Sequence, residues 1–309
     1  MIRILGTIFA GLLGLAFGSF LNVCLSRWPA GESIVRPRSH CRQCGRTLAW
    51  WENVPLVSWL ALRGRCRTCR AWIGWRYPLV ELAVGIPWAI YGWRESIALL
   101  NPDLPAQILY NSANDASNSA HELYNSLIFV AGKLLLCWLL VALASLDAEF
   151  LWLPDWITLP GTALGFGVYV MRLMLLKHWG ILYLRPYGVL GYAFQWLLGI
   201  LAAAGLILLI RWLYWLIRRR EGIGLGDAKL MALLAAWLGL PGALLAFGLG
   251  VVLGALASLV LLAVPSARSE SGTWALSKLP LGTFLCIGGI VSSLWGQTIL
   301  AAYLRWAGF

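Results

Sequence analysis

Long apolar runs alternate with shorter polar segments along most of the 309-residue chain. An apolar run of about twenty residues is long enough to cross a bilayer as a helix. We expect helical spans at residues 4–25, 77–100, 127–146, 156–176, 188–217, 230–240, 243–264 and 281–300. Pro241 and Gly242 break the pattern between the sixth and seventh runs, and the sixth is the shortest. The pattern predicts an all-α polytopic membrane protein with about eight transmembrane helices.

The first run has two interpretations. A cleaved signal peptide is one, but the run is longer than the usual apolar region of such a peptide and further spans follow it. We therefore favour a retained helix. Gly11, Gly14 and Gly18 lie at three- and four-residue spacings along it. Small residues at such spacings allow a neighbouring helix to approach closely.

Composition strengthens the membrane interpretation. The chain is 60% hydrophobic and 12% charged, with a mean hydropathy of +0.76, which excludes a soluble domain. Its 19 tryptophans suit the two membrane interfaces. The formal net charge is +11. In a membrane protein we attribute such a charge to loop orientation and anionic headgroups, and we expect the lipid bilayer as partner and no nucleic acid.

The basic residues also predict the orientation. With the N-terminus outside, the inner segments hold sixteen lysines and arginines and the outer segments hold six. Cytoplasmic segments carry this excess in membrane proteins. The orientation puts residues 27–76, Asp147 and Asp227 on the cytoplasmic side. Residues 101–125, rich in Asn and Ser, are expected to form a flexible external loop.

Residues 27–76 form the only sizeable polar segment, with ten arginines against Glu32 and Glu52. The segment contains two Cys-x-x-Cys pairs, Cys41 with Cys44 and Cys66 with Cys69. This spacing is typical of a four-cysteine structural zinc site, and Gly45 permits the tight turn that such a pair needs. Two disulfides, free thiols, or His40 in place of one cysteine are the alternatives. A reducing cytoplasm disfavours the disulfides. Metal binding would supply folding energy to a segment with little core.

Two carboxylates lie next to apolar runs on the cytoplasmic side. Asp147 closes the third run, and Asp227 follows three glycines in the stretch 222–229. Ionisable groups at membrane depth mark functional sites by default. The alternative for Asp227 is a solvated residue in a flexible loop. Asp155, next to Pro154, has two interpretations as well, a helix start or a catalytic group. We favour the helix start.

Two carboxylates that converge at one membrane surface suggest aspartic-protease chemistry. Two close carboxylates do not both ionise easily, so the pair keeps one proton. The ionised group takes a proton from water while its protonated partner polarises the scissile carbonyl. The sequence offers no evident Ser–His or Cys–His pair.

These residues belong to a wider set of short motifs: GSFLNV at 18–23, WENVPLVS at 51–58, RYPLVE at 76–81, LPD at 153–155 and GLGDAK at 224–229. Together with Asp147 and the four cysteines, they resemble the type IV prepilin peptidases (leader peptidase/N-methyltransferase) over nearly the whole chain. The chain departs from the family pattern before the last span. The family's Pro-Phe-Gly-Pro reads PLGT at 280–283 here, which puts any substrate-shaping role of that segment in doubt.

The resemblance implies a peptidase of the bacterial inner membrane with Asp147 and Asp227 as catalytic residues. Its substrates would be prepilins or type II secretion pseudopilins with a short basic leader. It also implies N-methylation of the new N-terminal residue with S-adenosylmethionine, although the sequence shows no methyl-donor site. A peptidase without methyltransferase activity is one alternative, and the cysteine segment argues against it. A non-enzymatic zinc-containing adaptor is the other.

The resemblance also suggests a division of the chain. Residues 1–26 would form the first transmembrane helix, residues 27–76 a cytoplasmic zinc-binding insert, and residues 77–309 the peptidase core. The oligomeric state and the particular pilin stay open at this stage.

Overall fold

The computed structural model describes residues 2–100, 116–178, 188–220, 224–263 and 280–308. Within these ranges most of the chain is helical, without a strand longer than an isolated bridge. The long helices are α1 (Ile2–Arg27), α3 (Arg76–Leu100), α5 (Ala116–Phe150), α6 (Asp155–His178), α7 (Gly188–Arg218), α8 (Leu225–Ala263) and α9 (Leu281–Trp306). Shorter helices lie between α1 and α3: η1 (Trp28–Ala30), η2 (Trp50–Asn53) and α2 (Val57–Ala61). The all-α prediction is confirmed.

Six of the described helices are long and apolar enough to cross a membrane. Their apolar stretches are Arg3–Ala30, Ser126–Phe150, Asp155–His178, Gly188–Arg218, Leu225–Val260 and Leu281–Trp306. This makes the chain a multi-pass membrane protein. The expected count of eight spans is not confirmed, because α3 falls outside the six and α8 is counted once.

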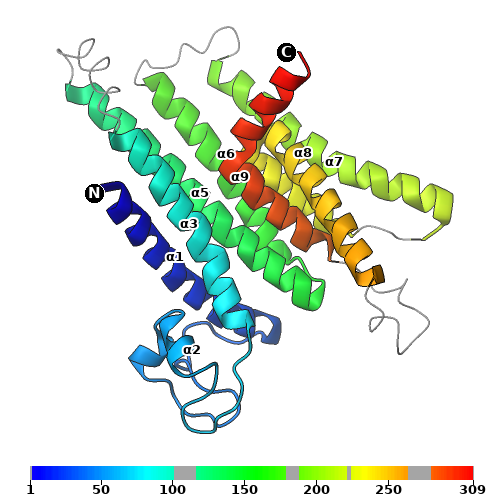
Figure 1. The fold of residues 1–309 in the computed structure, drawn as a ribbon. Helices are drawn as coiled ribbons and strands as arrows, with labels where there is room; N and C mark the ends of the chain where they lie inside the picture. Colours follow the sequence, from blue (N-terminus) through cyan, green and yellow to red (C-terminus); the bar gives the residue numbers. More distant parts are fainter. Residues whose placement is uncertain (1, 101–115, 179–187, 221–223, 264–279, 309) are drawn as a thin grey trace. The chain divides into compact units, whose positions relative to one another are not determined.

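The chain divides into two compact units. The first consists of residues 1–123 and 133–142, and α1 and α3 lie side by side in it (Figure 1). Glycines make their close approach possible. A Cβ atom on Gly14 would lie 2.8 Å from the Cβ of Trp88, and one on Gly18 would lie 2.7 Å from the Cα of Glu81. Because such contacts are too short for real Cβ atoms, a larger residue at either position would push the helices apart.

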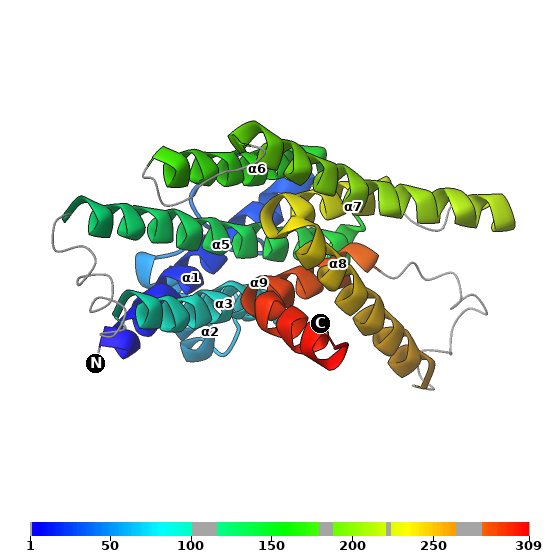
Figure 2. The ribbon, with the colours of Figure 1, turned by 90° about the horizontal axis from the view of Figure 1, so that it is seen from above.

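The second unit consists of residues 124–132 and 143–309. Here the two halves of α8 run in different directions (Figure 2). The first half follows α6 in parallel: Gly226 lies against Leu153, just before α6, and the Trp237 indole donates a hydrogen bond to the Gly161 carbonyl at 2.9 Å. The turn occurs at Gly239, whose φ of 73° is left-handed and suits glycine.

The second half of α8 packs antiparallel to α9. The Ser292 hydroxyl donates to the Gly242 carbonyl at 2.8 Å, and Gly250 lies against Leu285, near the start of α9. The second half therefore returns toward the end of the unit at which α8 began. This reversal agrees with the prediction of two segments at 230–240 and 243–264, but the break lies at Gly239 rather than at Pro241 and Gly242. Pro241 fits after the turn because its fixed φ suits the first turn of a helix.

One loop prediction was wrong in part. Residues 101–125 were expected to form a flexible loop, yet α5 begins at Ala116. Alanine, glutamate and leucine within residues 116–125 favour a helix, and this preference outweighs the polar composition on which the loop prediction rested. Residues 101–115 lie outside the described part of the chain.

Candidate active site and metal centre

Asp147 lies in the last turn of α5 and is 6% exposed. Its Oδ2 atom accepts a hydrogen bond from the backbone N–H of Thr283 at 2.7 Å, and the Thr283 hydroxyl lies 3.1 Å from the same oxygen. The hydroxyl is also 3.1 Å from the Ala144 carbonyl, one turn earlier in α5. A buried carboxylate needs hydrogen-bond partners, and the two donors of Thr283, at the start of α9, provide them for Asp147.

Gly282 gives Asp147 the room that it needs. A Cβ atom on Gly282 would lie 2.9 Å from Oδ2 of Asp147 and 3.0 Å from Cδ1 of Leu153. The first contact is shorter than real Cβ atoms show, and the second is tighter than nine in ten of their contacts. Glycine is therefore required for the N-terminal end of α9 to approach the carboxylate.

Asp227 lies in the first turn of α8 and is 8% exposed. Its Oδ2 atom accepts a hydrogen bond from the backbone N–H of Gly224 at 3.2 Å. Its helix is positioned by the neighbouring Gly226, where a Cβ atom would lie 3.1 Å from the Cβ of Leu153. The carboxylate thus sits at a helix N-terminus, where the helix dipole favours negative charge.

Leu153 connects the two carboxylates. It contacts Gly226 beside Asp227 and Gly282 beside the Thr283 donor of Asp147. Asp147 lies close enough to Asp227 for its charge to act on that carboxyl group, and the buried Cys286 lies within reach of both. The structure therefore brings together two residues that are 80 positions apart in the sequence. Two buried, interacting carboxylates can share one proton and activate a water molecule.

Asp155 takes a different position. It is the first residue of α6, as the sequence analysis expected, and its side chain is 59% exposed. Its Oδ1 atom pairs with Nζ of Lys229 at 2.5 Å. This ion pair links the first turn of α6 to the first turn of α8 at the surface of the unit. Asp155 supports the placement of these helices and does not join the carboxylate pair.

The four cysteines form a cluster in the first unit. The Sγ atoms of Cys41, Cys44, Cys66 and Cys69 all lie within 4.8 Å of one another. A tetrahedral ion with metal–sulfur bonds of about 2.3 Å requires sulfurs about 3.8 Å apart, and the sulfurs of Cys41 and Cys69 are 3.8 Å apart. All four cysteines are free thiols in the structure. The donor set and its spacing fit a four-coordinate metal ion.

Two similar turns build this cluster. In the first, the Gly45 N–H donates to the Cys41 carbonyl at 2.9 Å; in the second, the Arg70 N–H donates to the Cys66 carbonyl at 3.0 Å. Gly45 and Arg70 occupy the same place in the two turns and have φ of 69° and 59°. The predicted role of Gly45 is confirmed. Arg70 adopts the left-handed conformation without the freedom of glycine, at some cost in backbone strain.

Glu52 holds the first turn in place. Its carboxylate accepts two hydrogen bonds from the Arg46 guanidinium, at 2.6 and 3.0 Å, and one from the Ala49 N–H at 2.8 Å. The Arg46 hydrogen bonds keep the pKa of Glu52 below its usual value. Because the Arg46 carbonyl in turn accepts from the Cys41 N–H at 2.9 Å, the ion pair orients a metal-ligand turn.

The sulfur of Cys66 is prepared for metal binding. Hydrogen bonds from the backbone N–H groups of Cys69 and Thr68 lower the pKa of its thiol to about 6. A thiolate is the form that binds a metal ion. These hydrogen bonds favour the ligand form at Cys66 near neutral pH, whereas desolvation and the neighbouring cysteines raise the pKa of Cys69 to about 11.

Two family models match the chain. The first is described as "Bacterial Peptidase A24 N-terminal domain" and matches residues 12–95; the second is the "Type IV leader peptidase family" and matches residues 134–259. A relative from Pseudomonas aeruginosa, named prepilin leader peptidase/N-methyltransferase, is 33% identical over 96% of this chain and 93% of its own length. The chain belongs to the type IV leader peptidase family.

Other members of the leader peptidase family agree. A protein of the same name from Stutzerimonas stutzeri is 33% identical over 96% of this chain and 93% of its own. One from Burkholderia pseudomallei is 35% identical over 93% of this chain and 85% of its own. No solved structure matches the chain.

Sequence reasoning missed two parts of this leader peptidase site. In the sequence, Thr283 stands out only as a departure from the family's Pro-Phe-Gly-Pro, and this departure does not predict its hydrogen bonds to Asp147. A proline has neither a backbone N–H nor a hydroxyl. The family residue at this place therefore makes neither of the two hydrogen bonds that Thr283 makes to Asp147. In the sequence, Leu153 stands out only as part of the short motif LPD. Its contacts depend on three segments far apart in the sequence, so no local signal pointed to them.

Proposed function

We propose that this chain is a membrane aspartic endopeptidase that removes the basic leader from type IV prepilins or type II secretion pseudopilins. Asp147 and Asp227 are its catalytic residues. The observation that carries the proposal is the approach of these two buried carboxylates, whose flanking residues share contacts with Leu153. The names of the relatives support the same substrate class.

The chemistry is a direct attack by water. The pair holds one proton between its two carboxylates. The ionised member takes a proton from water, and the protonated member donates to the scissile carbonyl as charge develops there. The hydrogen bonds from Thr283 and Gly224 each fix one oxygen of a carboxylate and leave the other oxygen of that carboxylate for water or substrate. No covalent intermediate is needed.

We further propose that the cysteine cluster holds a structural zinc ion through Cys41, Cys44, Cys66 and Cys69. The support is the sulfur spacing and the absence of an open coordination position in a four-cysteine set. The ion would hold residues 27–76 in a folded state. It would stabilise the fold without entering the peptidase reaction.

The second activity we propose is N-methylation of the new N-terminal residue. S-adenosylmethionine would supply the methyl group. The names of the relatives support this activity, and a polar donor needs a water-facing site. Residues 27–76 and the adjoining cytoplasmic segments are therefore the expected home of the donor. No individual donor-binding residue is assigned.

The division of the chain and its location follow from the same proposal. Residues 1–26 form the first span, residues 27–76 the cytoplasmic zinc-binding insert and residues 77–309 the peptidase core, in the bacterial inner membrane. The excess of arginine in residues 27–76 supports a cytoplasmic face for both the insert and the carboxylates. A basic leader in the cytoplasm and an apolar pilin helix in the bilayer would then meet the carboxylate pair at the interface.

The experiment that tests the function is mass spectrometry of a prepilin co-expressed with this chain. Loss of the leader together with a methyl increment on the new N-terminus is the expected result. Leader loss without the increment would reduce the function to peptidase alone. An intact prepilin beside a folded chain would favour a non-enzymatic role.

A further inference from the structure

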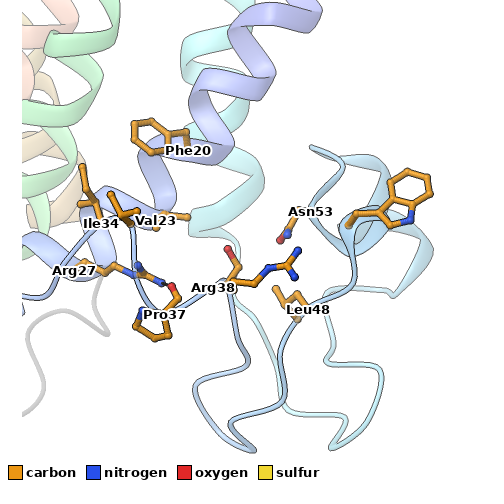
Figure 3. Close-up of a pocket in the computed structure, with 11 residues that line it drawn as sticks. Phe20, Val23, Arg27, Ile34, Pro37, Arg38, Leu48 and Asn53 are labelled. Carbon is orange, nitrogen blue, oxygen red and sulfur yellow. Dashed lines mark hydrogen bonds between the residues drawn. The ribbon is translucent and has the colours of Figure 1, made fainter.

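A pocket of about 280 Å³ lies in the first unit where α1 meets the polar insert (Figure 3). Its apolar wall comes from Phe20 and Val23 in the last turns of α1, and from Ile34, Val35 and Leu48. The polar part comes from the two arginines at 27 and 38 with neighbouring Ser39 and Asn53. The pocket has no acidic residue in its lining. Neither the carboxylate pair nor the cysteine cluster contributes to it.

One arginine builds the pocket. Arg27 is 4% exposed, and its guanidinium donates to the carbonyls of Ser33 at 2.7 Å and Pro37 at 2.6 Å. These bonds hold the loop after η1 against the end of α1. A further bond, from the Arg42 guanidinium to the Ser26 carbonyl at 2.5 Å, ties the first cysteine turn to the same helix end. The pocket is therefore formed in advance of any ligand.

Arg38, the second arginine of the pocket, is available to bind a ligand. Arg38 is exposed, and its guanidinium extends between Asn53 and Leu48 (Figure 3). Among the described residues, it has no hydrogen-bond or ion-pair partner for its side chain, and the same holds for the Asn53 amide. A cation and a polar amide beside an apolar wall suit a ligand that is an anion with an apolar part.

The location of the pocket favours a membrane lipid as its ligand. Phe20 and Val23 belong to the apolar stretch Arg3–Ala30, which is long enough to cross the membrane. The pocket thus begins at the end of a span and continues into the basic insert. Val35 and Trp50, which also line it, are 77% and 80% exposed, so apolar side chains remain uncovered here. The headgroup of a membrane lipid lies at this depth.

We propose that this pocket binds the phosphate headgroup of an anionic phospholipid, with Arg38 as the principal contact. A guanidinium presents paired N–H donors to a phosphate. The lipid's apolar chains would continue along Phe20 and Val23 of α1. The insert would then be attached to the membrane surface through a specific lipid as well as through α1 and α3.

The methyl donor is a weaker candidate for the same pocket. An arginine suits the carboxylate of S-adenosylmethionine, but the molecule also carries a sulfonium and an ammonium group, and two arginines without an acidic residue repel both. The volume is also just below the range of about 300–1,000 Å³ that encloses typical small ligands. A soluble phosphate would satisfy Arg38 but would leave the apolar wall uncovered.

Lipid titration followed by native mass spectrometry tests the proposal on the full chain in detergent. The probes are phosphatidylglycerol and phosphatidylcholine, and the variants are Arg38→Gln and Arg36→Gln. Arg36 is exposed, lies two residues away and does not line the pocket, so its loss makes the same change in net charge. Zinc content and size-exclusion profiles verify that both variants are folded.

We expect the wild type to prefer phosphatidylglycerol. Arg38→Gln weakens its binding on the order of tenfold, the effect of losing a hydrogen bond to a charged group. Arg36→Gln changes it by less than about twofold, as for an exposed charge. Equal losses in the two variants, or equal binding of the two lipids, would overturn the site.

Two competitors distinguish the other ligands. Glycerol 3-phosphate at the same concentration should not displace phosphatidylglycerol, and S-adenosylmethionine should not displace it either. Displacement by glycerol 3-phosphate would assign the pocket to a soluble phosphate. Displacement by S-adenosylmethionine that Arg38→Gln abolishes would assign it to the methyl donor. Either result would contradict the lipid proposal.

Discussion

Thr283 contacts a single oxygen of Asp147 with both of its donors. The backbone N–H lies 2.7 Å from Oδ2, and the hydroxyl lies 3.1 Å from the same atom. The hydroxyl has only one hydrogen and has the Ala144 carbonyl as a second acceptor at 3.1 Å. It can donate to Asp147 when that carboxylate is ionised and to Ala144 when it is protonated. Thr283 is thus suited to both states of the carboxylate pair.

Thr283→Val should lower kcat for leader removal about fivefold and leave KM unchanged, because the lost hydroxyl hydrogen bond orients Asp147 without touching the substrate. Thr283→Ser keeps the hydroxyl and should retain most of the activity. Steady-state kinetics on a prepilin in detergent would measure both constants. Wild-type kcat in Thr283→Val would show that the backbone N–H alone orients the carboxylate.

Asp147→Asn and Asp227→Asn should each abolish leader removal, with losses of at least roughly 10²–10⁴-fold, because each variant removes one partner of the acid–base pair. Asp155→Asn is the matched control, since the Asp155 carboxylate is exposed and forms an ion pair with Lys229 instead of belonging to the catalytic pair. It should keep much of the activity. Gel analysis of prepilin processing in membranes measures all three. Wild-type cleavage by either member of the pair would refute the assignment.

Purified protein should contain one zinc ion per chain, bound through sulfur. Zinc analysis by mass spectrometry and titration of accessible thiols would test this together. Removal of the metal by a chelator should expose four additional reactive thiols and lower the melting temperature, because the insert depends on the ion for its folding. Metal-free material with four titratable thiols, purified without chelator, would reject the site.

Cys41→Ser combined with Cys44→Ser should reduce methylation more than cleavage. The double change removes one of the two metal-ligand turns, whereas the carboxylate pair keeps its own contacts with Leu153 and Thr283. Precleaved pilin serves as methyl acceptor and intact prepilin as peptidase substrate, in the same membranes. Quantification of the variant in the membrane provides the control for insertion. Full methylation with lost cleavage would assign the insert to the peptidase.

The sequence was most informative where one short stretch carries a whole structural requirement. Each Cys-x-x-Cys pair predicts its own tight turn, and the structure brings the two pairs into one cluster. The apolar runs likewise predicted the long helices. The lengths and breaks of these helices were harder to predict, because α5 begins within a polar segment and α8 turns two residues before its proline. At Gly239 the backbone also accommodates the ring of Trp196, 2.9 Å from where a Cβ would be. That long-range contact leaves no local pattern.

The surroundings of the carboxylates could be predicted only in part. Asp147 ends an apolar run and Asp227 stands just before one, so their shared membrane face followed from charge and span order. Their roles remain predictions. The donors around them, Thr283 and Gly224, depend on how α9 and the loop before α8 approach the two helix ends. Such approaches are set by packing against Leu153 rather than by any residue pattern along the chain.

Because α8 reverses at Gly239, the depth of Asp227 in the membrane does not depend on the thickness of the bilayer. From Leu225 to the turn, the first half of α8 is about 20 Å long at 1.5 Å per residue, which is shorter than a hydrocarbon core of about 30 Å. A half-span has no second interface to match. Its depth is instead determined by the contact of Gly226 with Leu153, by the hydrogen bond from Trp237 to α6 and by the ion pair of Lys229 with Asp155. In a thicker or thinner membrane the full spans adjust by tilting. Asp227 would then move with the helices that hold Asp147, and the spacing of the pair would be preserved.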